Sequence, residues 1–198
     1  MTDAPQSQPS VNDLAPRAAK RKRTPLVIVN TGHGKGKTTA ALGTLMRAVA
    51  HGFKVVMLQF IKTTKDPRFG IYGEIQSAQK LGFEILPLGD GFTWDTNNPE
   101  QDRQTARRAW EVCLTKLQSP DYDIVALDEI TYAFNFGWLT TEEVIEAIKN
   151  RPAHMHVILT GRDAPPEIIE FADLVTEMRE VKHPFTTRRV VAQVGIEF

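Results

Sequence analysis

The stretch TGHGKGKTT, residues 31–39, decides the fold of this 198-residue chain. It follows the apolar run LVIV at residues 26–29, which predicts a short buried strand, and it precedes a helical pattern over residues 37–50. Glycines let the backbone turn sharply and direct successive N–H groups into one concavity. The helix N-terminus adds its positive dipole at the same place. The strand–loop–helix order therefore predicts a P-loop that binds nucleotide phosphates.

The second half of this motif, residues 36–38, follows the usual P-loop pattern, and its first half departs from that pattern. Lys37 would neutralise phosphate charge, and the Thr38 hydroxyl would bind Mg²⁺. Thr31 stands where the first glycine is usual, so the nucleotide is expected to lie differently from that of ordinary NTPases. The residues expected to hold the nucleotide are Gly32, His33, Gly34, Lys35, Gly36, Lys37, Thr38 and Thr39. Taken alone, His33 is more typical of a surface loop residue than of a base.

A P-loop site also needs an acid at the end of a buried strand, and residues 124–129 (IVALDE) supply two. Asp128 and Glu129 follow four apolar residues. In a hydrolase the second acid commonly orients a water molecule, and in a transferase it could bind Mg²⁺ directly. We expect Thr38, Glu129 and Asp128 to form the metal side of the site.

Strands and helices are expected to alternate along the rest of the chain. The predicted strands are 54–60, 83–86, 157–160, 174–178 and 189–194, and the predicted helices are 69–81, 100–118, 140–150 and 166–172. This alternation predicts an α/β fold with a mostly parallel sheet and helices on both faces, and the loop at residues 31–39 makes it one of the P-loop NTPase (RecA-like) type. Residues 25–198 would form this domain, and residues 1–24 a flexible basic tail.

Composition limits the classes of function. The 24 basic and 24 acidic residues balance, so net charge favours neither nucleic acid nor an anionic membrane as a partner. The single cysteine, Cys113, allows no intrachain disulfide, and we expect it to serve packing. No apolar run approaches the roughly 20 residues of a membrane span, and no secretory signal is recognised. A cytoplasmic protein is expected.

Three further stretches narrow the reaction, which Mg-ATP alone leaves open. GFTW at residues 91–94 places two large aromatics in a polar, glycine-containing loop, which on composition alone indicates either contact with a flat apolar partner or a loop packed onto the core by its aromatics. LDEITY at residues 127–132 extends the acidic motif, and LTGR at residues 159–162 places a Gly-Arg turn after a later strand.

With these motifs the sequence closely resembles the P-loop type of bacterial ATP:corrinoid adenosyltransferases, which act on cob(I)alamin or cob(I)yrinic acid a,c-diamide. The resembling stretches are NTGHGKGKTTAALGT, VVMLQFIK, GFTW, VALDEITY, ILTGR, VKHPF and VGIEF, and they span residues 26–198. His33 stands where relatives often have Asn, and Pro184 interrupts VKHPF.

The resemblance implies a cytoplasmic homodimer that joins the 5′-carbon of ATP to Co(I) and releases triphosphate, in adenosylcobalamin biosynthesis or salvage. It also implies that the phosphates bind in the reverse direction, that an electron-donating reductase or flavoprotein supplies Co(I), and that Arg47 contacts the nucleotide. Phe92 and Trp94 would lie against the corrin and displace its lower ligand. Lys37, Phe92 and Trp94 are the expected catalytic residues, and Mg²⁺ or Mn²⁺ the expected metal.

Two other functions stay open on the residues alone. A P-loop kinase or hydrolase would act at the γ-phosphate and yield ADP. A nucleotide-dependent binding module would carry corrinoids, or bind nucleic acid through the basic residues 17–23, without turnover. Product analysis would discriminate between them.

Overall fold

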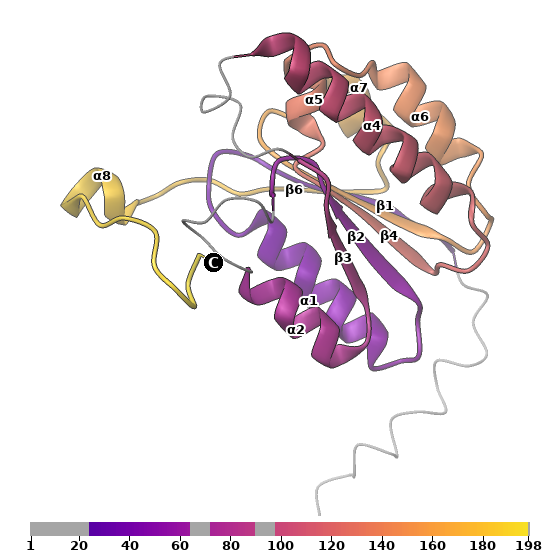
Figure 1. Ribbon diagram of the computed structural model, residues 1–198, viewed down its shortest axis with the longest axis horizontal. Coiled ribbons are helices and arrows are strands. Elements are labelled where there is room, and N and C mark those ends of the chain that lie inside the picture. Colours follow the sequence, from indigo (N-terminus) through magenta and orange to yellow (C-terminus); the bar gives the residue numbers. More distant parts are fainter. Residues whose placement is uncertain (1–23, 64–71, 90–97, 198) are drawn as a thin grey trace, which may run out of the picture.

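The computed structural model describes residues 24–63, 72–89 and 98–197, and its centre is a six-stranded sheet (Figure 1). The strands are β1 (Val27–Thr31), β2 (Val55–Gln59), β3 (Glu84–Pro87), β4 (Ile124–Asp128), β5 (His156–Thr160) and β6 (Leu174–Glu177). Their order is β3-β2-β4-β5-β1-β6, and every neighbouring pair is parallel. The strand that ends in Asp128 is therefore separated from the strand before the P-loop by β5.

Helices cover both faces of the sheet. On one face lie α1 (Lys37–Val49) and α2 (Gly73–Leu81). On the other lie α4 (Pro99–Gln118), α5 (Thr131–Asn135), α6 (Thr141–Lys149) and α7 (Pro166–Phe171), whose residues share one apolar cluster with the sheet. This arrangement confirms the α/β class, the parallel sheet and the two helical layers predicted from the sequence.

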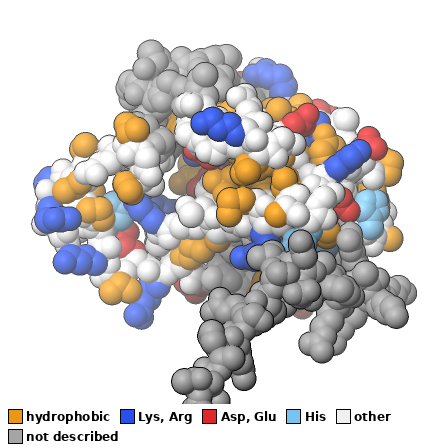
Figure 2. Space-filling view, turned by 90° about the horizontal axis from the view of Figure 1, so that it is seen from below, with side chains coloured by type: hydrophobic (Ala, Val, Ile, Leu, Met, Phe, Trp, Pro, Cys, Tyr) orange, Lys and Arg blue, Asp and Glu red, His pale blue; other side chains and the backbone are white. Residues whose placement is uncertain are grey.

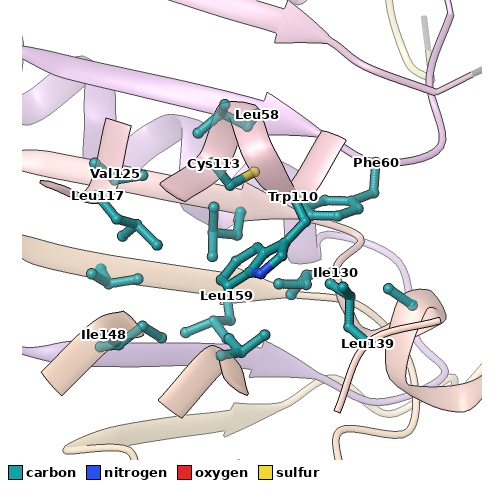
Figure 3. Packing of buried hydrophobic residues seen from close by; sticks show 14 of the residues in the cluster. Leu58, Phe60, Trp110, Cys113, Leu117, Val125, Ile130, Leu139, Ile148 and Leu159 are labelled. Carbon is teal, nitrogen blue, oxygen red and sulfur yellow. The ribbon is translucent and has the colours of Figure 1, made fainter. Parts of the chain in front are cut away.

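The strands are apolar on both faces because each face carries helices. In β4, Val125 and Leu127 pack in the cluster that includes α4, and Ile124 and Ala126 pack in the cluster that includes α1. Figure 3 shows Cys113 of α4 among Leu58 and Trp110 in the first of these clusters. Cys113 is fully buried, and burial raises the pKa of its thiol well above its ordinary value. The prediction that Cys113 serves packing is confirmed.

The predicted start of α6 is also confirmed. The Thr140 side chain accepts the N–H of Glu143, and the Glu143 carboxylate accepts the N–H of Thr140. This reciprocal pair is a capping box, which satisfies two N–H groups that a helix N-terminus otherwise leaves without partners.

Some predicted elements were wrong. Residues 189–194 form no strand; they follow α8 (Pro184–Arg188), a short helix that the sequence did not predict. The β-branched residues there favoured a strand, but within the described residues this segment does not join the sheet. The helix expected over residues 69–81 is present as α2, which begins at Gly73, and residues 64–71 lie outside the described residues. The short helix α5 was also missed.

The chain leaves the sheet after β6 and forms a projecting arm, residues 179–197 (Figure 1). Figure 2 shows Lys and Arg side chains interspersed with apolar ones over this arm. Its largely exposed apolar residues are Val181, Phe185, Val191, Val194 and Ile196. Among the described helices, none combines the length and apolar character that crossing a membrane requires.

Candidate active site

Four strand ends bring the polar residues of the site to one edge of the sheet. Because the strands are parallel, their carboxyl ends meet at the same edge, where α/β proteins bind ligands. The register places Gln59 of β2 beside Asp128 of β4, and Asn30 of β1 beside Thr160 of β5. The predicted P-loop follows β1 at this edge, so the loop and the acids are brought together.

The P-loop leads directly into α1. Gly36 precedes the helix with φ 109°, a conformation that favours glycine, and no side chain caps the helix N-terminus. The first N–H group bonded back along the helix is that of Ala40, which donates to the Gly36 carbonyl. The N–H groups of the three residues before it, Lys37, Thr38 and Thr39, are those that a helix leaves for an external acceptor. This terminus can therefore bind an anion.

Lys37 lies inside the loop. Its Nζ donates to the carbonyl oxygens of Gly32 at 2.9 Å and Gly34 at 2.8 Å, and the residue is only 6% exposed. Burial lowers the pKa of the Lys37 ammonium, and the neighbouring Glu129 carboxylate acts in the opposite direction. The predicted phosphate-neutralising cation is thus held at the centre of the loop.

The glycines at the unusual beginning of the loop accommodate a neighbouring backbone. A Cβ at Gly32 would lie 2.6 Å from the Met178 carbonyl oxygen, and one at Gly34 would lie 2.7 Å from it. The Gly34 N–H donates to that carbonyl, and the Met178 N–H donates to the Thr31 carbonyl. Gly32 and Gly34 therefore allow the chain after β6 to pack on the loop, and the Gly34 N–H is already engaged there.

The two acids have different surroundings. Asp128 is fully buried and accepts three hydrogen bonds, from Thr38 Oγ1 at 2.8 Å, Thr160 Oγ1 at 2.7 Å and Gln59 Nε2 at 3.1 Å. Because the Thr38 hydroxyl gives its proton to Asp128, its oxygen lone pairs remain available to a cation. Asp128 therefore orients Thr38.

The Glu129 carboxylate is largely buried, and its Oε2 has no hydrogen-bond partner among the described residues. Burial and the adjacent Asp128 raise the pKa of Glu129 to about 7, although Lys37 and Arg162 act against this rise. Its backbone lies in the left-handed region with φ 60°, which a non-glycine residue seldom adopts. A buried, unpaired carboxylate oxygen in a strained residue is typical of a functional site.

Comparison with known proteins places the chain in a family. The family model described as ATP:corrinoid adenosyltransferase BtuR/CobO/CobP matches residues 23–198. The corrinoid adenosyltransferase of Escherichia coli (strain K12) is 44% identical over 173 residues, which cover 87% of this chain and 85% of that protein. That of Pseudomonas aeruginosa is 39% identical over 188 residues, which cover 91% of this chain and 87% of that protein.

The chain belongs to the ATP:corrinoid adenosyltransferase family. A solved structure of the flagellar accessory protein FlaH from Methanocaldococcus jannaschii has the same fold, with a TM-score of 0.51 at 12% identity. The match covers 77% of this chain and 70% of FlaH.

Three of the predicted nucleotide-binding residues of this adenosyltransferase lie toward the surface. His33 Nε2 is 3.0 Å from Asp163 Oδ1, and both side chains are mostly exposed. Lys35 is paired with Glu197 at the end of the projecting arm. Arg47 is exposed in the last turn of α1, ten residues after Lys37 and so about 15 Å along the helix from it. The roles of these residues stay predictions.

Phe92 and Trp94, the expected corrin-contacting residues, lie outside the described residues. Two further polar residues of the site were missed by the sequence analysis, Gln59 and Thr160, although both contact Asp128. A signal was available: each is the polar last residue of an apolar strand, as Asp128 is. In a parallel sheet such residues converge at one edge.

Proposed function

We propose that this protein transfers the 5′-deoxyadenosyl group of ATP to the Co(I) centre of a corrinoid and releases triphosphate. Membership of the adenosyltransferase family supports the choice of reaction. The observation that carries the proposal at the site is the buried Lys37 ammonium inside a P-loop. It lies beside Glu129, whose carboxylate affects its pKa.

The geometry suits a reaction in which triphosphate leaves. Cobalt attacks C5′, the C5′–O bond breaks, and negative charge grows on the departing oxygen. Donors that are already in place stabilise such charge better than groups that must reorganise. In this chain Lys37 and the N–H groups at the start of α1 are the donors placed for that purpose.

The residues present also fit a divalent cation. The Thr38 oxygen and the unpaired Glu129 Oε2 are hard oxygen ligands, which Mg²⁺ and Mn²⁺ prefer. No cluster of three or more His, Cys, Asp or Glu suitable for a metal occurs within the described ranges. Such a cation would be held jointly by protein and phosphate oxygens, as is usual for Mg²⁺. When bound, it would supply charge neutralisation on the triphosphate.

The remaining parts of the proposal rest on the resemblance. Phe92 and Trp94 would contact the corrin and help to remove its lower ligand, and Arg47 and Lys35 would contact the nucleotide. A reductase or flavoprotein would provide Co(I), and the protein would act as a cytoplasmic homodimer. The basic residues 17–23 have no assigned role.

Identification of both products tests the function. The purified protein is mixed with Mg-ATP and chemically reduced Co(I) corrinoid without oxygen. We expect a light-sensitive adenosylated corrinoid and intact triphosphate in equal amounts. ADP and phosphate with unmodified corrinoid would instead assign the reaction to the γ-phosphate, with Glu129 orienting water.

A further inference from the structure

The Asp128 carboxylate is fixed by neutral donors from three elements. The hydroxyls of Thr38 in α1 and Thr160 in β5 donate to Oδ1, and the Gln59 amide in β2 donates to Oδ2. Asp128, Gln59 and Thr160 are all 0% exposed. Because both carboxylate oxygens are engaged, the rotamer of Asp128 is set before any substrate arrives.

Thr160 connects this carboxylate to the second acid. Its single hydroxyl proton goes to Asp128, and its oxygen accepts the backbone N–H of Glu129 at 2.9 Å. Glu129 holds the left-handed backbone conformation, φ 60°. Since φ sets the direction in which the side chain leaves the backbone, the bond to Thr160 helps to direct the Glu129 carboxylate.

Packing alone does not explain why polar residues occupy the buried positions of Gln59 and Thr160. Gln59 Oε1 is buried and has no hydrogen-bond partner among the described residues, and an unpaired buried polar atom destabilises a fold. Reversing the amide would place Oε1 against the Asp128 carboxylate, so the orientation with Nε2 toward Asp128 is required. Methionine in place of Gln59, or valine in place of Thr160, would fill similar volume without buried polar atoms.

We propose that Thr160, assisted by Gln59, is a positioning residue for adenosyl transfer. It acts through Asp128 and Glu129, whose placement beside the P-loop it fixes in advance. This inference rests on the proposed function. Its physical basis is that a preorganised group needs no reorientation when charge develops in the transition state.

The decisive variants are Thr160→Val, which removes the hydroxyl at nearly constant shape, and Thr160→Ser, which keeps it. With Mg-ATP and preformed Co(I) corrinoid, we expect Thr160→Val to lower kcat about 10- to 100-fold, each tenfold being about 1.4 kcal/mol of barrier. KM for ATP should change far less, since the loop and Lys37 are unaltered. Thr160→Ser should restore kcat to within about threefold of the wild type, because a hydroxyl is again present.

Thr44→Val is the matched control, because the Thr44 hydroxyl donates only within α1, to the Ala40 carbonyl at 3.0 Å. Its kcat should equal that of the wild type. A second test is Gln59→Met, for which we expect a lower kcat with a melting temperature equal to or above that of the wild type. A purely structural role would instead lower the melting temperature and leave kcat unchanged.

The two levels of inference can fail separately. Wild-type protein that forms no adenosylated corrinoid would overturn the proposed function and this inference with it. An active wild type with kcat of Thr160→Val within about twofold of it would overturn the inference alone. If Thr160→Val does not fold, the test rests on Gln59→Met, and a kcat of this variant within about twofold of the wild type would overturn the inference.

Discussion

Lys37 is the residue on which the phosphate site depends most. Its ammonium is buried within hydrogen-bond distance of two loop carbonyls, so its removal takes a buried positive charge out of the loop. We expect Lys37→Ala to lower kcat/KM for ATP at least about 100-fold, as loss of a preorganised charge-stabilising group commonly does.

Lys54→Ala is the control for this measurement. Lys54 is exposed and precedes β2, at the edge of the sheet opposite the loop. Steady-state rates of corrinoid adenosylation for the two variants check the expectation. Equal activities of Lys37→Ala and the wild type would contradict the phosphate-binding role of the loop.

The raised pKa of Glu129 predicts that the stability of the protein without ligands depends on pH. Its pKa is about 7 in the fold against 4.5 as the ordinary value, so the folded state keeps a proton that the unfolded state has lost between these two values. Stability therefore falls as pH rises from about 4.5 to 7 and levels off above that range. The loss attributable to this group is on the order of 3 kcal/mol.

Glu129→Gln isolates the effect, since glutamine does not titrate. Urea unfolding of both proteins between pH 5 and pH 8 should show nearly equal free energies of unfolding at pH 5 and a more stable variant at pH 8. A difference between the two proteins that stays constant across this range would show that Glu129 has an ordinary pKa.

At the scale of single residues, the sequence predicted the site residues that belong to a recognisable motif and missed those that do not. The P-loop and Asp128-Glu129 were recognisable from spacing and strand context. Gln59 and Thr160 were missed because their partnership with Asp128 depends on strand order. That order is set by long-range pairing, which periodicity does not reveal.

At the scale of elements, the P-loop and the segment after β6 act as one unit. The backbone of Met178 and Arg179 passes so close to Gly32 and Gly34 that a methyl group would collide with it. We expect Gly34→Ala to destabilise the protein and to weaken nucleotide binding, because either the loop or the segment after β6 must move.

Gly43→Ala is the control for Gly34→Ala, because it should raise the stability of the protein rather than lower it. Gly43 lies inside α1, and a Cβ added there would meet open space, so alanine should stabilise the helix by up to about 1 kcal/mol. Thermal unfolding of both variants checks the pair. A Gly34→Ala variant as stable as the wild type would contradict the steric role of the Met178 backbone at this position.

Elements with a clear apolar run or a recognisable cap were predictable, and short helices without either were not. The β4 strand and the capped α6 helix appeared as expected. The five-residue helices α5 and α8 have too few residues to show a period, so no pattern predicted them. The VVAQV run at residues 190–194 has strand-forming residues, yet it pairs with no strand of the described sheet, because strand propensity alone does not place a segment in a sheet.

At the scale of the whole molecule, the projecting arm contributes little to the fold that carries the site. Its side-chain ion pair with the body joins exposed Lys35 to Glu197, and exposed pairs contribute about 0–1 kcal/mol. A chain that ends after Glu180 should thus fold, with a melting temperature within about 4 °C of the full chain.

A chain that ends after Ala172 is the comparison. It lacks β6, which pairs with β1, and it lacks the Met178 backbone bonded to the loop. Circular dichroism during heating should show a much larger loss of stability for this shorter chain. Equal losses in both chains would mean that the arm itself stabilises the sheet.

The strand order also governs when the nucleotide site can form during synthesis. The strand before the P-loop is made first, yet its two neighbours, β5 and β6, lie at residues 156–160 and 174–177. On the ribosome, β2 and β3 can pair while β1 still has no partner. ATP capture would therefore begin only after β5 and β6 have emerged, which makes nucleotide binding a late check on the folding of this sheet.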